Sequence, residues 1–212
     1  MRLFLGGVVH DDPAMVGPVR AWLRDLRISH QKPPAFVAVE WYPDVLNQYP
    51  QAWDDFMVLA RRDWACAAEH DVRSVADSIA FEAVCADEIF GAKRILWLDS
   101  DRHYDHPGRE VFSWHQWRLL LRGEGKRCPT LVKLSLMSRG AAQAAARKPA
   151  RDKLLADRLL AAVPPQDDSW GVAVLGALHV SNCWPDTTRR ILETAGQDCT
   201  DPYFFGWEPC LQ

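Results

Sequence analysis

Four apolar segments of this chain end abruptly in side chains that can carry charge or exchange a proton. In chain order these side chains are His10, Glu40, the group Asp99, Asp101 and Arg102, and finally His179. Two imidazoles, a carboxylate and an arginine gathered at one place can bind a metal ion, or they can act as a base and an electrostatic stabiliser. Either chemistry requires segments that are far apart in the sequence to end at the same place in the fold.

The two histidines share a local motif, Gly-x-x-His. It occurs as Gly7-Val8-Val9-His10 and again as Gly176-Ala177-Leu178-His179. We expect each glycine to let a neighbouring segment approach closely, and each histidine to lie at the end of a strand. One copy is a weak signal, whereas two copies with Glu40 between them indicate a shared site.

The elements that must position these residues alternate along the chain. Apolar runs predict strands, and 3- and 4-residue spacing of apolar side chains predicts helices. The predicted strands are 2–9, 35–39, 94–98, 171–176 and an edge strand at 203–205, and the predicted helices are 15–26, 52–69, 74–90, 110–121, 131–146, 151–162 and 186–194. This alternation is typical of one α/β domain over residues 1–212, with a central, mainly parallel sheet flanked by helices. The carboxyl ends of parallel strands meet at one edge, where open α/β sheets bind ligands.

The composition narrows the class of protein. The chain has 212 residues and 24.1 kDa, is 48% hydrophobic, and carries 25 basic against 28 acidic residues. Such a chain buries roughly 70% of its unfolded surface, which excludes disorder as the main state. The net charge of -3 argues against nucleic acid as a partner. No apolar run reaches the ~20 residues that a membrane span needs.

Cysteine usage favours a cytoplasmic protein with reduced thiols. The six cysteines are irregularly spaced and include no Cys-x-x-Cys pair, which excludes a zinc ribbon. One bridge among Cys183, Cys199 and Cys210 stays open. The N-terminal segment predicts a first strand and not a signal peptide, since no small-x-small cleavage site follows it.

Together these motifs resemble the TraB/Tiki family, which is related to the erythromycin-esterase-like and ChaN-like proteins. The resemblance extends from residue 4 to about residue 180. It rests on the two Gly-x-x-His motifs, the proline-started strand ending at Glu40, Asp99-Ser100-Asp101-Arg102, and the helix start Arg151-Asp152. The chain departs from the family at Val8-Val9, where a polar residue is usual, and it is too short for the family's longer helical insertions.

The resemblance implies a metal-dependent hydrolase of the peptidase type. His10, Glu40 and His179 would bind a divalent metal ion (manganese, cobalt or zinc), whose open position would hold a water for attack. Glu40, Arg102 and Arg151 would be catalytic, with a peptide or a small molecule as substrate. Arg151 shares a helical face with Leu155 and Leu159, so its side chain is predicted to point inward, where a buried arginine needs a partner.

Other interpretations remain at this stage. One is a metal-free hydrolase of the erythromycin-esterase type, with a histidine as base and Glu40 in support. Another is a non-catalytic binding protein, such as the haem-binding ChaN relatives. Arg102 and Arg151 could form plain ion pairs, and the segment with His103 and His106 is interpreted as a polar loop. Glu82 lies beside the Ile79/Ala83 stripe and could reach the site, but it is expected to be exposed to solvent.

Overall fold

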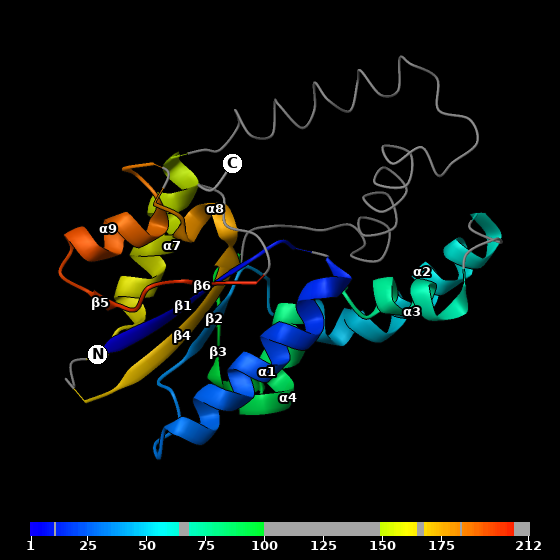
Figure 1. Ribbon diagram of the computed structural model, residues 1–212, viewed down its shortest axis with the longest axis horizontal. Coiled ribbons are helices and arrows are strands. Elements are labelled where there is room, and N and C mark those ends of the chain that lie inside the picture. Colours follow the sequence, from blue (N-terminus) through cyan, green and yellow to red (C-terminus); the bar gives the residue numbers. More distant parts are fainter. Residues whose placement is uncertain (11, 64–67, 100–148, 165–167, 183, 206–212) are drawn as a thin grey trace.

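A parallel sheet lies at the centre of the computed structural model, which describes residues 1–10, 12–63, 68–99, 149–164, 168–182 and 184–205 (Figure 1). Its strands run in the order β3-β2-β4-β1-β5, and β6 also pairs with β1. Every pairing is parallel. The bounds are β1 Arg2–Val8, β2 Val37–Val39, β3 Ile95–Trp97, β4 Trp170–Gly176, β5 Asp198–Cys199 and β6 Tyr203–Phe204.

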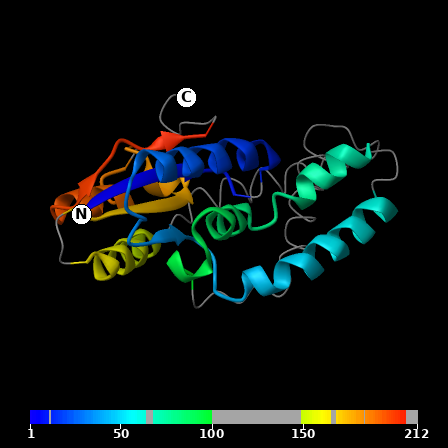
Figure 2. The same cartoon turned by 90° about the horizontal axis from the view of Figure 1, so that it is seen from below.

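Helices cover both faces of this sheet (Figures 1 and 2). One face packs against α1 (Pro13–Ser29) and α4 (Phe81–Phe90), with α2 (Val45–Asp63) and α3 (Glu69–Ala76) extending the same apolar core. The other face packs against α7 (Pro149–Ala162), α8 (Ala177–Val180) and α9 (Thr188–Thr194). The expected fold class, α/β with a mainly parallel sheet flanked by helices, is confirmed.

The first helix shows how sequence sets an element here. Asp12 caps α1 by accepting a hydrogen bond from the Ala14 N–H at 3.0 Å, and Pro13 occupies the first turn, where a missing N–H costs nothing. Met15, Val19, Leu23 and Leu26 then form the buried stripe. Their 3- and 4-residue spacing presents one continuous apolar face to the sheet.

The predicted single helix over residues 74–90 is wrong. α3 ends at Ala76 and α4 begins at Phe81, with a turn between them. Ala80, at the start of α4, has a left-handed backbone with φ of 49°. Apolar periodicity continues across this turn because both helices face the same core, which explains why the spacing alone did not reveal the break.

Other elements shift at their ends. α2 begins at Val45 instead of residue 52 and ends at Asp63. His179 lies in the short helix α8 and not in a strand, because β4 already ends at Gly176. The predicted helices at 110–121 and 131–146 lie outside the described residues. Within the part of the chain that the structure describes, no helix is both long and apolar enough to cross a bilayer.

Candidate functional site

The carboxyl edge of the sheet brings His10, Glu40 and His179 together. β4 lies between β1 and β2. His10 follows β1, Glu40 follows β2 directly, and His179 follows β4 through the start of α8. The predicted convergence of these three side chains is therefore what the structure shows, and parallel pairing is its cause.

The backbone of Gly176 lies against all three side chains of this cluster. Its N–H donates to Glu40 Oε2 at 2.5 Å. A Cβ atom added to Gly176 would lie 3.0 Å from His10 Nε2, 3.3 Å from His179 Cδ2 and 3.4 Å from Glu40 Oε2. The glycine of the second motif thus makes room for the site's own side chains.

Each ring nitrogen of His10 faces a glutamate, Glu82 at Nδ1 and Glu40 at Nε2. Its Nδ1 lies 2.6 Å from Glu82 Oε1, and its Nε2 lies 3.3 Å from Glu40 Oε2. Glu82 is fully buried in α4, and its Oε2 also accepts the Trp41 Nε1–H at 3.0 Å. The expectation that Glu82 is exposed to solvent is wrong. The His10 side chain itself is 37% exposed, so solvent reaches the ring.

His179 repeats the same arrangement from the opposite face of the sheet. Its Nδ1 lies 2.9 Å from Asp152 Oδ1 in α7, and its Nε2 lies 3.5 Å from Glu40 Oε1. Asp152 Oδ1 also accepts from the Thr188 N–H at 2.7 Å and from the Thr188 hydroxyl at 2.9 Å. Three donors thus share one oxygen of a buried carboxylate, and the His179 side chain is only 17% exposed.

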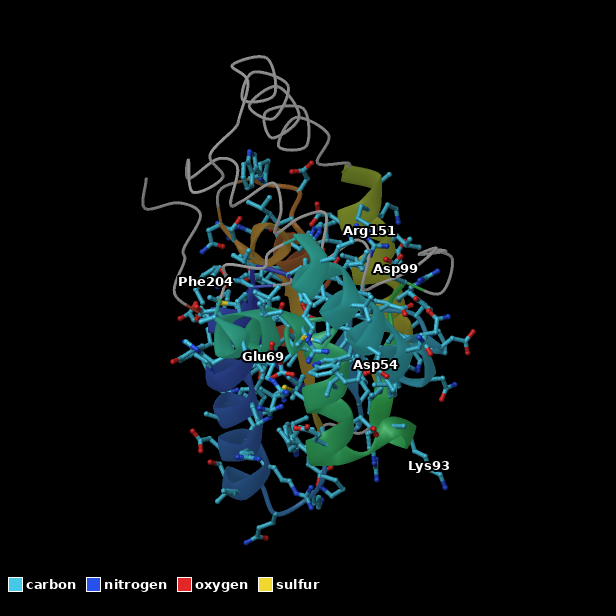
Figure 3. The ribbon with its side chains drawn as sticks, turned by 90° about the vertical axis from the view of Figure 1, so that its right-hand side faces the viewer. Asp54, Glu69, Lys93, Asp99, Arg151 and Phe204 are labelled. Carbon is cyan, nitrogen blue, oxygen red and sulfur yellow. The ribbon has the colours of Figure 1, made fainter. Side chains whose placement is uncertain are left out.

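Arg151 points inward, as its spacing predicts. Its guanidinium donates to Asp99 Oδ1 at 2.8 Å and to Glu40 Oε1 at 3.4 Å. Figure 3 shows Arg151 on α7 beside Asp99. The arginine therefore bridges the carboxylates that follow β2 and β3. Arg102, the other predicted arginine, lies outside the described residues, as do Asp101, His103 and His106.

Buried negative charge dominates the site. Four carboxylates are almost completely buried, namely Glu40, Glu82, Asp99 and Asp152. Arg151 supplies one positive charge in contact with them. In the described part of the chain these carboxylates contact Arg151 and both imidazoles, and their negative charge favours the protonated form of each ring.

The pKa values follow from this excess of negative charge. Burial by itself lowers the pKa of His10, but Glu82 and Glu40 raise it well above the ordinary 6.5. Burial also lowers the pKa of His179, and Glu40 and Asp152 raise it above that value. Burial raises the pKa of Glu40, but His179, His10 and the Gly176 N–H hold it far below its usual range. The surroundings therefore favour the doubly protonated form of both rings and the ionised form of Glu40.

The cluster has the ligand types of a metal site but not its free donors. Among the residues that the structure describes, no three or more His, Cys, Asp or Glu side chains are arranged to hold a metal ion. Both Glu40 oxygens already face N–H donors, with Gly176 and His10 at Oε2 and Arg151 and His179 at Oε1. A metal ion would have to displace these contacts, so the arrangement as it stands does not fit one.

Comparison with known proteins identifies no family for this chain. No family model matches the chain, and no curated protein or solved structure matches it. The TraB/Tiki resemblance stays a prediction that rests on the motifs.

Three residues of the cluster were not among the site residues predicted from the sequence. Glu82 had a signal, because it is the single charged residue in the apolar run from Ile79 to Ala86. Asp152 stands next to Arg151, but a helix start gives acidic residues an ordinary role, which conceals a second one. Thr188 offered no signal, since its contact with Asp152 depends on how α9 packs on α7. Cys85 and Cys199, the cysteines in the described part, are free thiols.

Proposed function

We propose that this chain is a metal-independent hydrolase of ester or amide bonds, with His10 as the general base. The observation that carries the proposal is the pair of imidazoles whose Nδ1 atoms are bonded to buried carboxylates and whose Nε2 atoms face one glutamate. The motif resemblance to the erythromycin-esterase-like relatives of the TraB/Tiki family supports the same class.

His10 is suited to take a proton from water. It is the more exposed of the two rings, so water and a substrate can approach Nε2. When Nε2 has lost its proton, that atom can accept one from a water molecule, while Nδ1–H stays bonded to Glu82 and the imidazolium that forms is stabilised. Glu40 is a poor base because its pKa is held so low.

The protonated form of His179 is stabilised by Asp152 and Glu40, which both face the ring, and the ring is largely enclosed. In that state it can stabilise developing negative charge or protonate a leaving group. Arg151 forms ion pairs with Glu40 and Asp99, and Glu40 in turn lies between the Nε2 atoms of the two rings.

The pH dependence follows from these roles. The two histidines lose their protons in two steps that belong to the pair. The first loss creates the base and the second removes the acid, which gives a bell-shaped profile. Because Glu40, Glu82 and Asp152 raise both pKa values, we expect both limbs to lie above pH 6.5.

The test measures turnover of nitrophenyl esters and nitroanilide amides by protein dialysed against a chelator. We expect activity to survive chelation, and His10→Asn to lower kcat by about 10²- to 10⁴-fold, the usual contribution of a general base. His70→Asn is the matched control, because His70 is exposed on α3 and contacts only Asp71 among the ion pairs described. Turnover that is absent, or that is equal in wild type and His10→Asn, would contradict the proposal.

A metal-dependent hydrolase using manganese, cobalt or zinc is the second candidate. One observation favours it: a carboxylate on the Nδ1 of each histidine is the usual partner of metal-binding imidazoles. His10, Glu40 and His179 would hold the ion, which would supply an activated water. An ion retained at one per chain after gel filtration, absent from His179→Ala, together with activity lost on chelation, would establish this candidate and overturn the first.

A further inference from the structure

We propose that Glu82 is a positioning residue that, together with Trp41, fixes which nitrogen of the neutral His10 ring carries the proton. The catalytic consequence rests on the proposed function, but the tautomer itself does not. Neither Glu82 nor Trp41 belongs to the two Gly-x-x-His motifs. Glu82 comes from α4 and Trp41 from the residue after Glu40, so the fold brings the three side chains together.

The hydrogen bonds of Glu82 favour one of the two tautomers of the neutral His10 ring. Glu82 Oε2 accepts the Trp41 Nε1–H at 3.0 Å, and an indole nitrogen can only donate. The other oxygen, Oε1, lies 2.6 Å from His10 Nδ1, and an ionised carboxylate can only accept. Since Glu82 is fully buried, no bulk water can replace either partner. Both ring nitrogens face a carboxylate, but Nδ1 lies 2.6 Å from Glu82 Oε1, whereas Nε2 lies 3.3 Å from Glu40 Oε2. The shorter contact favours the proton of the neutral ring on Nδ1, which leaves the lone pair of Nε2 toward the site.

The substitution Glu82→Gln would leave only one side-chain acceptor for the two donors, Trp41 and His10. The side-chain amide has one accepting oxygen and one donating nitrogen, whereas Trp41 and His10 both present donors. If the amide oxygen accepts from Trp41, the amide nitrogen faces His10 Nδ1, which must then accept. The ring is driven to the Nε2–H tautomer, which has no lone pair facing the site and cannot act as the base.

Removing the indole donor should resolve the conflict. In Glu82→Gln/Trp41→Phe the amide group can rotate so that its oxygen accepts from His10 Nδ1–H. The double variant should then restore the tautomer that the single variant loses. A purely structural role for Glu82 predicts the reverse, since a second substitution in the buried core should add to the damage.

The experiment records histidine nitrogen shifts by NMR in ¹⁵N-labelled full-length protein, at a pH where the His10 ring is neutral. We expect Nδ1–H in wild type and Trp41→Phe, Nε2–H in Glu82→Gln, and Nδ1–H again in the double variant. Where a substrate is found, kcat should fall at least tenfold in Glu82→Gln and recover severalfold in the double variant. Glu88→Gln is the matched control, because Glu88 lies on the same helix, half exposed, and pairs with Arg20.

Two outcomes would overturn the inference. One is an unchanged Nδ1–H tautomer in a folded Glu82→Gln protein, which alone decides the matter if the double variant does not fold. The other is a folded double variant that stays in the Nε2–H form. The tautomer is measured without substrate. If the protein hydrolyses none of the substrates, the proposed function is wrong, but the NMR measurement still tests this inference.

Discussion

At the residue scale, the Nδ1 atom of each histidine of the site contacts a different buried carboxylate. Glu82 contacts His10 and Asp152 contacts His179, while Glu40 lies between the two Nε2 atoms. This arrangement orients both rings and fixes which atoms face outward. A single carboxylate could not do both, because its two oxygens would have to reach both Nδ1 atoms on opposite sides of the cluster.

Gly176→Ala should impair the site more than the fold. The added Cβ would meet His10, Glu40 and His179 at 3.0 to 3.4 Å, so these side chains must move. The neighbours must give by a few tenths of an ångström, and since a misplacement of about 1 Å can cost on the order of 10²-fold in rate, the expected loss is smaller than that. We expect kcat to fall while the circular dichroism spectrum is unchanged.

Gly6→Ala is the control for this prediction. In the same sheet, a Cβ at Gly6 would meet Trp22 at 2.9 Å and Phe205 at 3.2 Å, away from the histidines. It should lower the midpoint of urea unfolding but leave kcat of the folded protein intact. Equal effects of the two substitutions on kcat would show that Gly176 has no special place in the site.

The sequence allowed His10, Glu40 and His179 to be predicted as neighbours, because each follows an apolar strand and parallel strands end together. Glu82 could not be placed in the same way. Its contact with His10 depends on where the turn between α3 and α4 sets the start of α4. Side-chain spacing carries no information on that offset.

At the element scale, Asp152 joins three elements. It lies in α7, bonds His179 of α8, and accepts two hydrogen bonds from Thr188 at the start of α9. The three helices on this face of the sheet are therefore linked by hydrogen bonds to one buried carboxylate. Figure 1 shows α7, α8 and α9 clustered together on their side of the sheet.

Asp152→Ala should destabilise the fold strongly. It removes the partner of the buried Thr188 N–H and of His179, whereas the Thr188 hydroxyl can still donate to the backbone carbonyl of residue 152. Unsatisfied buried groups cost about 1–3 kcal/mol each, so a loss of about 2 kcal/mol or more is expected in urea unfolding. Asp157→Ala on the exposed side of α7 is the control. It removes only the surface pair with Lys153, worth about 0–1 kcal/mol. Similar losses for both would refute the role given to Asp152.

Element type was predictable where one face of a segment repeats, as in α1, or where a whole segment is apolar, as in β4. The break at residues 77–80 was not, because the left-handed backbone of Ala80 occurs at a residue type that rarely adopts it. The helix containing His179 was not predicted either. Four residues are too few to show a period.

At the scale of the whole molecule, the site couples folding to pH in two directions. His10 and His179 have pKa values raised on folding, so their contribution to stability is complete below pH 6.5 and is lost as the pH rises through the raised values. Glu40 and Asp152 have lowered pKa values, so their contribution is present above their ordinary values of 4.5 and 3.8 and is lost at lower pH. We expect a maximum of stability between these windows.

Urea unfolding at a series of pH values checks this expectation. The wild type should lose stability steadily above pH 6.5, and His10→Asn should show a shallower loss, since one of the raised groups is gone. His70→Asn should follow the wild-type curve, because its ring is exposed. A wild-type curve that stays flat through the alkaline range would contradict protonated histidines in the resting site.

The position of β4 has a consequence for synthesis. β1 ends at Val8 and β2 at Val39, but the strand that lies between them begins only at Trp170. While the ribosome is still making the intervening chain, β1 has no partner strand and β2 can pair only with β3, so the edges that β4 later joins are bare. Such edges attract other chains, so the nascent protein should depend on chaperones until β4 emerges.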